Sequence, residues 1–251
     1  MEDLGPFIVL PKCGGGNLRA LMSRTDFIPL SRSVDILAQI ATAVDFAHRH
    51  GIVHGDIKPE NILFSADMTQ ALLADFGAAK FSPPQERLTT QQGSGREAGT
   101  AAYMSPEQLS EGVQSARSDV YSLAVVAFEL LTGQLPFDST APLYRQMHAK
   151  VSGNLLNPGD INPLLAPHVR EALLAGLAKE PVIRPKAAID FIDLLTGNAT
   201  SPAQSKSTAD SGFWGSLDSK NKVALITAII AALGGIAATV IKIVPDLLKK
   251  H

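Results

Sequence analysis

The sequence contains a short polar stretch, HGDIKPEN at residues 54–61, whose residue types and spacing are suited to chemistry. It holds a carboxylate at Asp56, an ammonium at Lys58 and a carboxamide at Asn61, and a second carboxylate follows at Asp75 in ALLADFG. A carboxylate can accept a proton from a hydroxyl group, and carboxylate and amide oxygens are ligands that Mg²⁺ prefers. Each residue alone could be an ordinary surface group, so the spacing of all four carries the prediction.

Short apolar segments flank this stretch and must position it. Residues 52–53 precede it, residues 62–64 follow it, and a third segment at the start of ALLADFG leads to Asp75, which predicts three short strands. Upstream, apolar residues recur at three- and four-residue spacing between Val34 and Ala47. This spacing predicts an amphipathic helix that ends near residue 51, a glycine.

The remaining elements are mostly helical. Residues 7–10 predict a buried strand, followed by a glycine turn and a helix capped by Asn17. SDVYSLAVVAFELLTG is apolar all round, which predicts a fully buried helix ended by Gly133. The polar residues 78–105 predict a long mobile loop. Further helices are predicted at residues 143–151, 168–178 and 187–195. The expected fold class is mainly α (α+β).

The order and spacing of these motifs resemble those of the eukaryotic-like Ser/Thr protein kinases, a family that bacteria also carry. Residues 54–61 meet the family's catalytic-loop pattern H-R-D-x-K-x-x-N, apart from its arginine. DFG follows at residues 75–77, and GTAAYMSPE at residues 99–107 is similar to the family's A-P-E segment. Asp119 and Arg184 match two further landmarks. The ordered matches indicate a protein-kinase-like C-terminal lobe.

The resemblance implies a role for each polar residue of the stretch. Asp56 would accept the proton of the substrate hydroxyl, and Lys58 would place a cation near the γ-phosphate of ATP. Asn61 and Asp75 would be the metal ligands for Mg²⁺ and so help to bind Mg-ATP. Lysine at position 58 and Thr100 ahead of SPE resemble Ser/Thr specificity. The implied substrates are therefore Ser and Thr hydroxyls of proteins.

The front of the chain resembles the last strand of the family's N-terminal lobe and the hinge that follows it. Leu10 would close the back of the adenine pocket, and Pro11 and Cys13 would offer a carbonyl and an N–H to the adenine edge. Leu63 would form the apolar floor under the base. The glycines at 14–16 predict a hinge turn, because they lack the G-x-G-x-x-G spacing and the following lysine of phosphate-cradling loops.

Two features depart from the family pattern. Gly55 stands where the family usually has an arginine that pairs with a phosphate on the activation loop, so activation by loop phosphorylation loses its usual receiver. Upstream there is no counterpart of the glycine-rich loop, the strand lysine or the helix glutamate, and Lys12 lies too close to His54 to be that lysine. We therefore expect an N-lobe that is truncated to a vestigial strand in this sequence. Three explanations stay open: the sequence begins too late, another polypeptide completes the lobe, or the protein is a degenerate kinase with a reduced lobe.

The composition changes after residue 197. Residues 198–222 are rich in small polar residues, which predicts a flexible linker. Residues 223–241 carry no charge and would span about 28 Å as a helix, close to the ~30 Å hydrocarbon core of a bilayer. We expect a transmembrane helix over residues 223–244 and a short tail over 245–251. A buried soluble helix and an in-plane amphipathic helix are the alternatives, but the segment has no polar face.

Partners and location follow from the same features. Without an export signal at the N-terminus, we expect a single-pass protein of the cell membrane whose kinase lobe is cytoplasmic. The small residues Ala224, Ala228 and Ala232 have a spacing that could support a homodimer. The net charge of −2, with no long basic run, argues against nucleic acid as a partner. The single cysteine excludes an internal disulfide.

The expected organisation places the last N-lobe strand and the hinge in residues 1–18 and a kinase C-lobe in residues 19–197. The favoured function is a membrane-tethered Ser/Thr protein kinase that transfers the γ-phosphate of Mg-ATP to protein hydroxyls. Two alternatives stay open. One is a pseudokinase that serves as a docking module at the membrane with little or no phosphoryl transfer. The other is a helical membrane protein without a nucleotide role.

Overall fold

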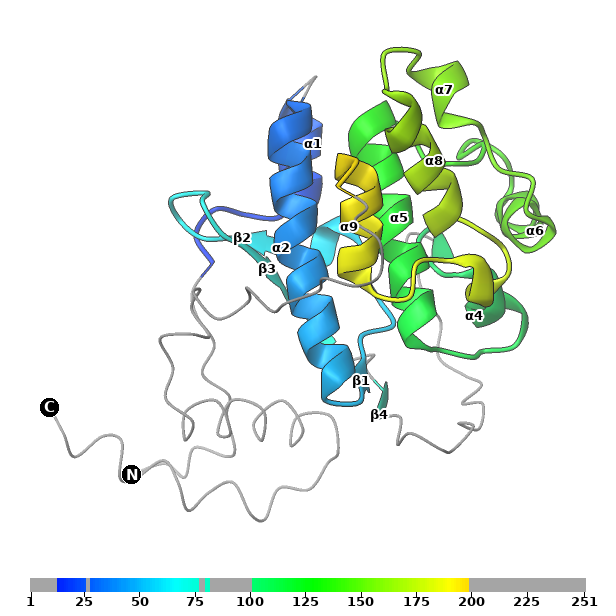
Figure 1. Ribbon diagram of the computed structural model, residues 1–251, viewed down its shortest axis with the longest axis horizontal. Coiled ribbons are helices and arrows are strands. Elements are labelled where there is room, and N and C mark those ends of the chain that lie inside the picture. Colours follow the sequence, from blue (N-terminus) through cyan, green and yellow to red (C-terminus); the bar gives the residue numbers. More distant parts are fainter. Residues whose placement is uncertain (1–12, 26–27, 77–79, 82–100, 199–251) are drawn as a thin grey trace, which may run out of the picture. The chain divides into compact units, whose positions relative to one another are not determined.

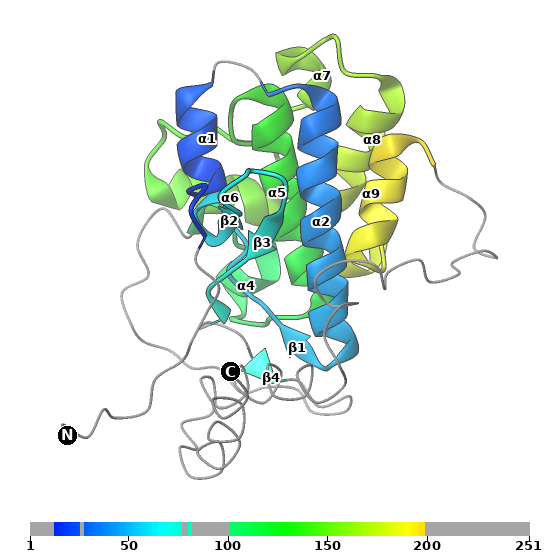
Figure 2. The same ribbon diagram turned by 90° about the vertical axis from the view of Figure 1, so that its left-hand side faces the viewer.

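Two long helices form the centre of the structure. The computed structural model describes residues 13–25, 28–76, 80–81 and 101–198. Helix α2 (Leu30–Arg49) packs against α5 (Ala116–Thr132), and α9 (Ala188–Thr196) packs against both. Helix α8 (Pro167–Gly176) packs against α5 and α9 on the side that faces away from α2 (Figure 1). The same arrangement is visible in the turned view (Figure 2).

Helix α5 is the most deeply buried element. It begins with a capping box in which the side chains of Ser115 and Ser118 each bond the other residue's backbone N–H, and it ends at Gly133 in a left-handed conformation. Its residues from Ser118 to Leu130 are all buried. A helix that is apolar on every face must lie inside the protein, so the predicted buried helix is confirmed.

The first two helices also follow their sequence signals. Helix α1 (Leu18–Arg24) begins at Asn17, whose side chain accepts a hydrogen bond from the backbone N–H of Ala20 at 2.8 Å. Helix α2 ends at Arg49, two residues before Gly51. Its buried face contains Ile36, Leu37, Ile40, Ala41 and Val44. The predicted cap and the predicted amphipathic helix are both confirmed.

The strands are short and form two separate pairs. β2 (Ile62–Phe64) and β3 (Ala71–Leu73) are antiparallel, with Ile62 opposite Leu73. β1 (Ile52–Val53) pairs with β4 (Lys80–Phe81), also antiparallel. Strands β1, β2 and β3 confirm the three predicted apolar segments. Strand β4 corrects the prediction of a loop from residue 78 onward, because its backbone pairs with β1.

The second half of the described chain is helical. Helix α6 (Leu143–Ser152), α8 and α9 lie within two residues of their predicted ranges. Four shorter elements were not predicted, because each is too short to show a helical period: η1 (Pro59–Asn61), α4 (Pro106–Ser110), α7 (Pro158–Ile161) and η3 (Pro181–Ile183). Each of them starts with proline, which suits the first position of a helix.

The prediction of a mobile loop is wrong for its last residues, 103–105. Tyr103, Met104 and Ser105 are buried against the helices instead of projecting into solvent. The mainly helical fold class is confirmed for the residues that the structure describes. None of the helices in these residues is long and apolar enough to cross a bilayer. The predicted span over 223–244 and the predicted strand over 7–10 lie outside the described residues.

Candidate active site

Three of the predicted site residues converge in the loop after β1. The carboxylate of Asp56 lies 3.0 Å from the ammonium of Lys58. The side-chain nitrogen of Asn61 donates to the carboxylate of Asp56 at 3.1 Å and to its backbone carbonyl at 2.8 Å. Asn61 is 8% exposed. Because its amide nitrogen faces Asp56, its amide oxygen is directed away from that carboxylate and can act as a ligand.

The backbone that leads into Asp56 is held by Asp119, which is fully buried in the first turn of α5. The two carboxylate oxygens of Asp119 accept hydrogen bonds from the backbone N–H of His54 at 2.9 Å and of Gly55 at 2.8 Å. The ring Nε2 of His48 on α2 lies 2.7 Å from the same carboxylate. The sequence marked Asp119 as a landmark, and the structure shows that it fixes the two residues before Asp56.

Asp75 is brought towards Asn61 by the β2–β3 hairpin. The backbone N–H of Ala74 donates to the carbonyl of Asn61 at 2.8 Å, directly beyond the last strand pair. Asp75 is exposed and has a φ of 63°, a left-handed conformation that aspartate tolerates better than most residues. The hairpin therefore carries the two predicted magnesium ligands to the same end.

His54 connects the Asp56 loop with the segment around Asp75. Its Nε2 lies 3.1 Å from the carbonyl of Ala74, its Nδ1 lies 3.2 Å from the backbone N–H of Asp56, and its ring meets Phe76 edge-on at 4.6 Å. Burial lowers the pKa of His54, although the charge of Asp119 opposes this shift. The ring is therefore neutral at pH 7, with Nε2 donating to Ala74 and Nδ1 accepting from Asp56.

The glycines before α1 form a turn that runs along β2. The backbone N–H of Gly15 donates to the carbonyl of Phe64 at 3.1 Å, and the N–H of Phe64 donates to the carbonyl of Gly16 at 2.9 Å. A Cβ atom on Gly15 would lie 2.3 Å from the backbone oxygen of Ser65, so the approach requires glycine at this position.

This turn places the predicted adenine-binding residues that the structure describes. Asn17 pairs with Leu63 as an isolated bridge, which brings Leu63 beside the turn, and Cys13 lies half-buried at its start. Leu10 and Pro11 lie outside the described residues. The predicted turn is present, and its role as a nucleotide hinge stays a prediction.

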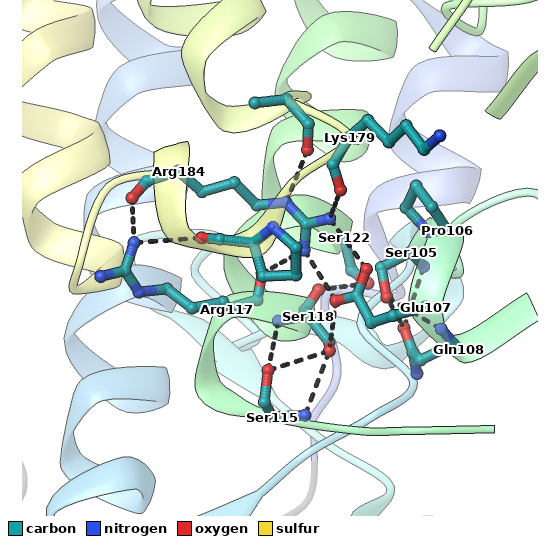
Figure 3. Close-up of polar contacts among 12 residues, drawn as sticks. Ser105, Pro106, Glu107, Gln108, Ser115, Arg117, Ser118, Ser122, Lys179 and Arg184 are labelled. Atoms are coloured by element: carbon teal, nitrogen blue, oxygen red, sulfur yellow. Dashed lines mark hydrogen bonds and ion pairs between the residues drawn. The ribbon is translucent and has the colours of Figure 1, made fainter. Parts of the chain in front are cut away.

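A buried ion pair anchors the chain downstream of the site. The guanidinium of Arg184, which is 2% exposed, donates to the two carboxylate oxygens of Glu107 at 2.7 and 2.8 Å (Figure 3). The hydroxyl of Ser118 donates to Glu107 at 2.7 Å. Burial alone would raise the pKa of Glu107, but the hydrogen bonds from Arg184 and Ser118 outweigh it and lower the pKa. Glu107 is therefore ionised.

A second ionic cluster was not predicted. Arg19 on α1 pairs with Glu60 at 2.8 Å and with Glu129 on α5 at 2.7 Å. The hydroxyl of Tyr103 donates to Glu129 at 2.5 Å and also contacts the Arg19 guanidinium. Glu60 lies in η1, beside Asn61. Nothing in the sequence signals this cluster, because its members come from four separate segments.

The donor set is compatible with the magnesium that the family implies. Within the described ranges, no three His, Cys, Asp or Glu side chains are grouped so as to hold a metal. Mg²⁺ does not require such a cage, since it keeps several waters and binds one or two protein oxygens together with phosphate oxygens. The carboxylate of Asp75 and the amide oxygen of Asn61 are hard donors of this kind, so the residues fit the ion.

The fold and the site define a class of protein. The structure is a helical lobe in which the buried α5 holds a polar loop through Asp119, with a short strand pair on either side of the loop. The sequence motifs predicted a kinase C-terminal lobe with this loop between short apolar segments. A family model described as "Protein kinase domain" matches residues 4–198. The chain belongs to the protein kinase domain family.

Curated relatives agree with the bacterial branch of the family. The chain is 34% identical over 186 residues to the serine/threonine-protein kinase PknB of Mycolicibacterium smegmatis, which covers 74% of this chain and 29% of that protein. It is 41% identical over 149 residues to the serine/threonine-protein kinase PknL of Mycobacterium tuberculosis, which covers 58% of this chain and 36% of that protein. The predicted resemblance is confirmed, and the chain spans about a third of the length of these relatives.

Proposed function

We propose that the chain is a Ser/Thr protein kinase that transfers the γ-phosphate of Mg-ATP to Ser and Thr hydroxyls of proteins. The observation that carries this proposal is the convergence of Lys58 and Asn61 on Asp56. The side-chain nitrogens of Lys58 and Asn61 lie 3.0 and 3.1 Å from the Asp56 carboxylate. The relatives' names, serine/threonine-protein kinases, support the same activity.

Each side chain has a role in this reaction. Asp56 orients the acceptor hydroxyl and accepts its proton at the carboxylate. Asn61 holds Asp56 in place by one hydrogen bond to this carboxylate and one to the backbone carbonyl of the same residue. Lys58 places a positive charge beside this carboxylate, where the phosphate of the nucleotide would enter. Phosphoryl transfer needs mainly positioning and charge neutralisation from the protein, so a loop fixed by the buried Asp119 suits it.

The cofactor belongs to the same proposal. Mg²⁺, when bound, neutralises charge on the phosphates, and Asn61 and Asp75 would hold it. The adenine would lie against the hinge, between Leu10, Pro11 and Cys13 on one side and Leu63 on the other.

We further propose that residues 223–244 tether the lobe to the cell membrane as a single transmembrane helix, with the lobe in the cytoplasm. The uncharged run of residues 223–241, with lysines at 220, 222 and 242, supports this proposal. Protease treatment of vesicles that carry an epitope at His251 tests the topology. An epitope cleaved from the cytoplasmic side would contradict it.

The activity is tested with the full chain in detergent, alone and with the nucleotide-binding lobe of a bacterial kinase added in trans. We expect transfer of radiolabelled phosphate from ATP to casein or myelin basic protein, lost in Asp56→Ala. The exposed Asp160 provides the matched control, and Asp160→Ala should keep the activity. Thermal stabilisation by Mg-ATP without any transfer would favour the docking module instead. If the chain neither binds Mg-ATP nor transfers phosphate, with or without the added lobe, the proposal is wrong.

A further inference from the structure

Lys150 on α6 is a buried lysine whose charge has an unusual set of partners. Its side chain is 1% exposed. The ammonium donates hydrogen bonds to three backbone carbonyls, those of Ala101 at 3.0 Å, Ala102 at 2.5 Å and Met104 at 2.8 Å. An ammonium group has three protons to donate, so all three are used on one short piece of backbone. We call residues 101–104 the clamped segment.

Two aromatic rings lie close to the Lys150 ammonium. The ammonium lies 5.1 Å from the ring centre of Phe137 and 5.7 Å from that of Tyr121. In the described part of the chain it forms no ion pair with a carboxylate. Burying a charge without an ionic partner is costly, whereas methionine or leucine would fill the same space at no such cost. A purely space-filling role therefore does not account for a lysine here.

Side chains of two helices hold the clamped segment. The fourth carbonyl, that of Tyr103, accepts a hydrogen bond from the hydroxyl of Ser122 on α5 at 2.8 Å. Four consecutive carbonyls thus accept hydrogen bonds from side chains of α5 and α6. The backbone shape of the segment depends on these donors, of which Lys150 supplies three.

The clamped segment borders the candidate active site at two points. The Tyr103 hydroxyl joins the Arg19 cluster, which includes Glu60 in the turn beside Asn61. Just beyond the segment, the side chain of Gln108 donates to the carbonyl of Gly55 at 3.1 Å. A shift of the clamped segment would therefore disturb contacts that reach Gly55 and Glu60, on either side of Asp56, the proposed base for the acceptor hydroxyl.

We propose that Lys150 is a positioning residue for the protein substrate, which acts by holding the carbonyls of residues 101, 102 and 104 so that the clamped segment can receive the acceptor peptide. This inference rests on the proposed kinase activity. Lys150 itself contacts neither nucleotide nor acceptor, so its loss should weaken the binding of protein substrate and leave the binding of ATP unchanged.

The test compares Lys150→Met with Lys150→Arg, which keeps the charge and several donors, and with Lys186→Met, a control on an exposed lysine. Hydrogen–deuterium exchange at pH 6.5 should rise about tenfold or more in residues 101–105 of Lys150→Met and stay unchanged in α5. The KM for myelin basic protein should rise about tenfold, with the KM for ATP unchanged. Lys150→Arg should show smaller rises in exchange and in the KM for myelin basic protein. Lys186→Met should match the parent chain in both measurements.

The outcomes separate this inference from the proposed function. A parent chain that transfers no phosphate refutes the proposed function, whereas exchange in residues 101–105 is still measurable. Unchanged exchange and unchanged KM in Lys150→Met, in an active parent background, refute only the inference. An equal rise in both KM values would also refute it, since that result indicates general loss of structure. If Lys150→Met does not fold, Lys150→Gln replaces it with the same criteria.

Discussion

Glu107 and Arg184 lie 77 positions apart in the chain and meet through two parallel hydrogen bonds of 2.7 and 2.8 Å. Arg184 also donates to the backbone carbonyls of Ala178, Lys179 and Arg117. The pair thereby fastens the loop after α8 to the start of α4 and to α5. Because α4 follows the clamped segment directly, this ion pair fixes one end of the segment and Lys150 fixes its middle.

Removal of the Arg184 guanidinium should destabilise the fold strongly, since it leaves the buried carboxylate of Glu107 without its partner. We expect Arg184→Met to lower the free energy of unfolding by about 3–5 kcal/mol, measured by urea denaturation followed by circular dichroism. The exposed Arg145 gives a matched control that should change stability by less than about 0.5 kcal/mol. The double variant Glu107→Gln/Arg184→Met should regain part of the loss. A single variant within 1 kcal/mol of the parent, on the order of an ordinary surface change, would contradict the role of the pair.

The charge of Asp75 should set the magnesium requirement. Asparagine also tolerates the left-handed backbone at this position, so Asp75→Asn removes the charge with little effect on the fold. We expect the Mg²⁺ concentration that gives half-maximal transfer to rise at least about tenfold, because a ligand should matter no less than its outer-shell partners. Asp160→Asn is the control on an exposed aspartate. An unchanged Mg²⁺ requirement would show that Asp75 holds no metal.

Substitution by alanine should destabilise the glycine turn at Gly15 for a different reason than at Gly16. Alanine at 15 would meet the backbone of Ser65 and push the turn away from β2, at a cost of about 1–3 kcal/mol. Alanine at 16 would meet nothing within 4 Å and would suffer only from its φ of +80°, at about 1–2 kcal/mol. We expect weaker binding of Mg-ATP, measured by calorimetry, in Gly15→Ala and not in Gly16→Ala. Equal affinities would contradict the hinge assignment.

Lys150 should make stability depend on pH. Burial lowers its pKa from 10.5 to about 7 in the folded chain. Between these values the unfolded chain binds a proton that the folded chain does not, so the free energy of unfolding rises with pH, by at most about 1.4 kcal/mol per pH unit. Lys150→Met should lose this rise, measured by urea denaturation at pH 6.5, 8 and 9.5.

The neighbours of Lys150 do not mask this comparison. The rings of Tyr121 and Phe137 face the ammonium, and Arg184 lies over the Tyr121 ring at 4.8 Å. Burial raises the pKa of Tyr121, and this group is present in both proteins, so its contribution cancels in the difference. Parallel pH profiles for the parent and the variant would show that Lys150 does not titrate in this range.

The elements that sequence reasoning located are those with a local signal. The all-round apolar run of α5 and the three- and four-residue spacing of α2 depend on burial of a helix face, which a sequence records directly. The Asp56 loop was visible for a similar reason, because its functional residues lie within a few positions of each other. The hairpin that brings Asp75 to Asn61 follows from two apolar segments close together in the chain.

What escaped prediction depends on contacts between distant segments. The Arg19 cluster joins residues up to 110 positions apart, and each charge in it resembles an ordinary surface group when read alone. The clamped segment lies within the predicted mobile loop because the prediction rests on the polar composition of residues 78–105 as a whole. Its order comes from Lys150 and Ser122, side chains of helices that follow it in the sequence.

Arg19 connects α1, the first helix after the glycine turn, to η1 in the Asp56 loop and to Tyr103 in the clamped segment. A tilt of α1 would therefore pull on both at once. Nucleotide seated against the turn and peptide seated against the segment would each alter the position of the same guanidinium. The two substrates of the proposed reaction would then bind cooperatively through a single side chain, and shortening that side chain would make their affinities independent.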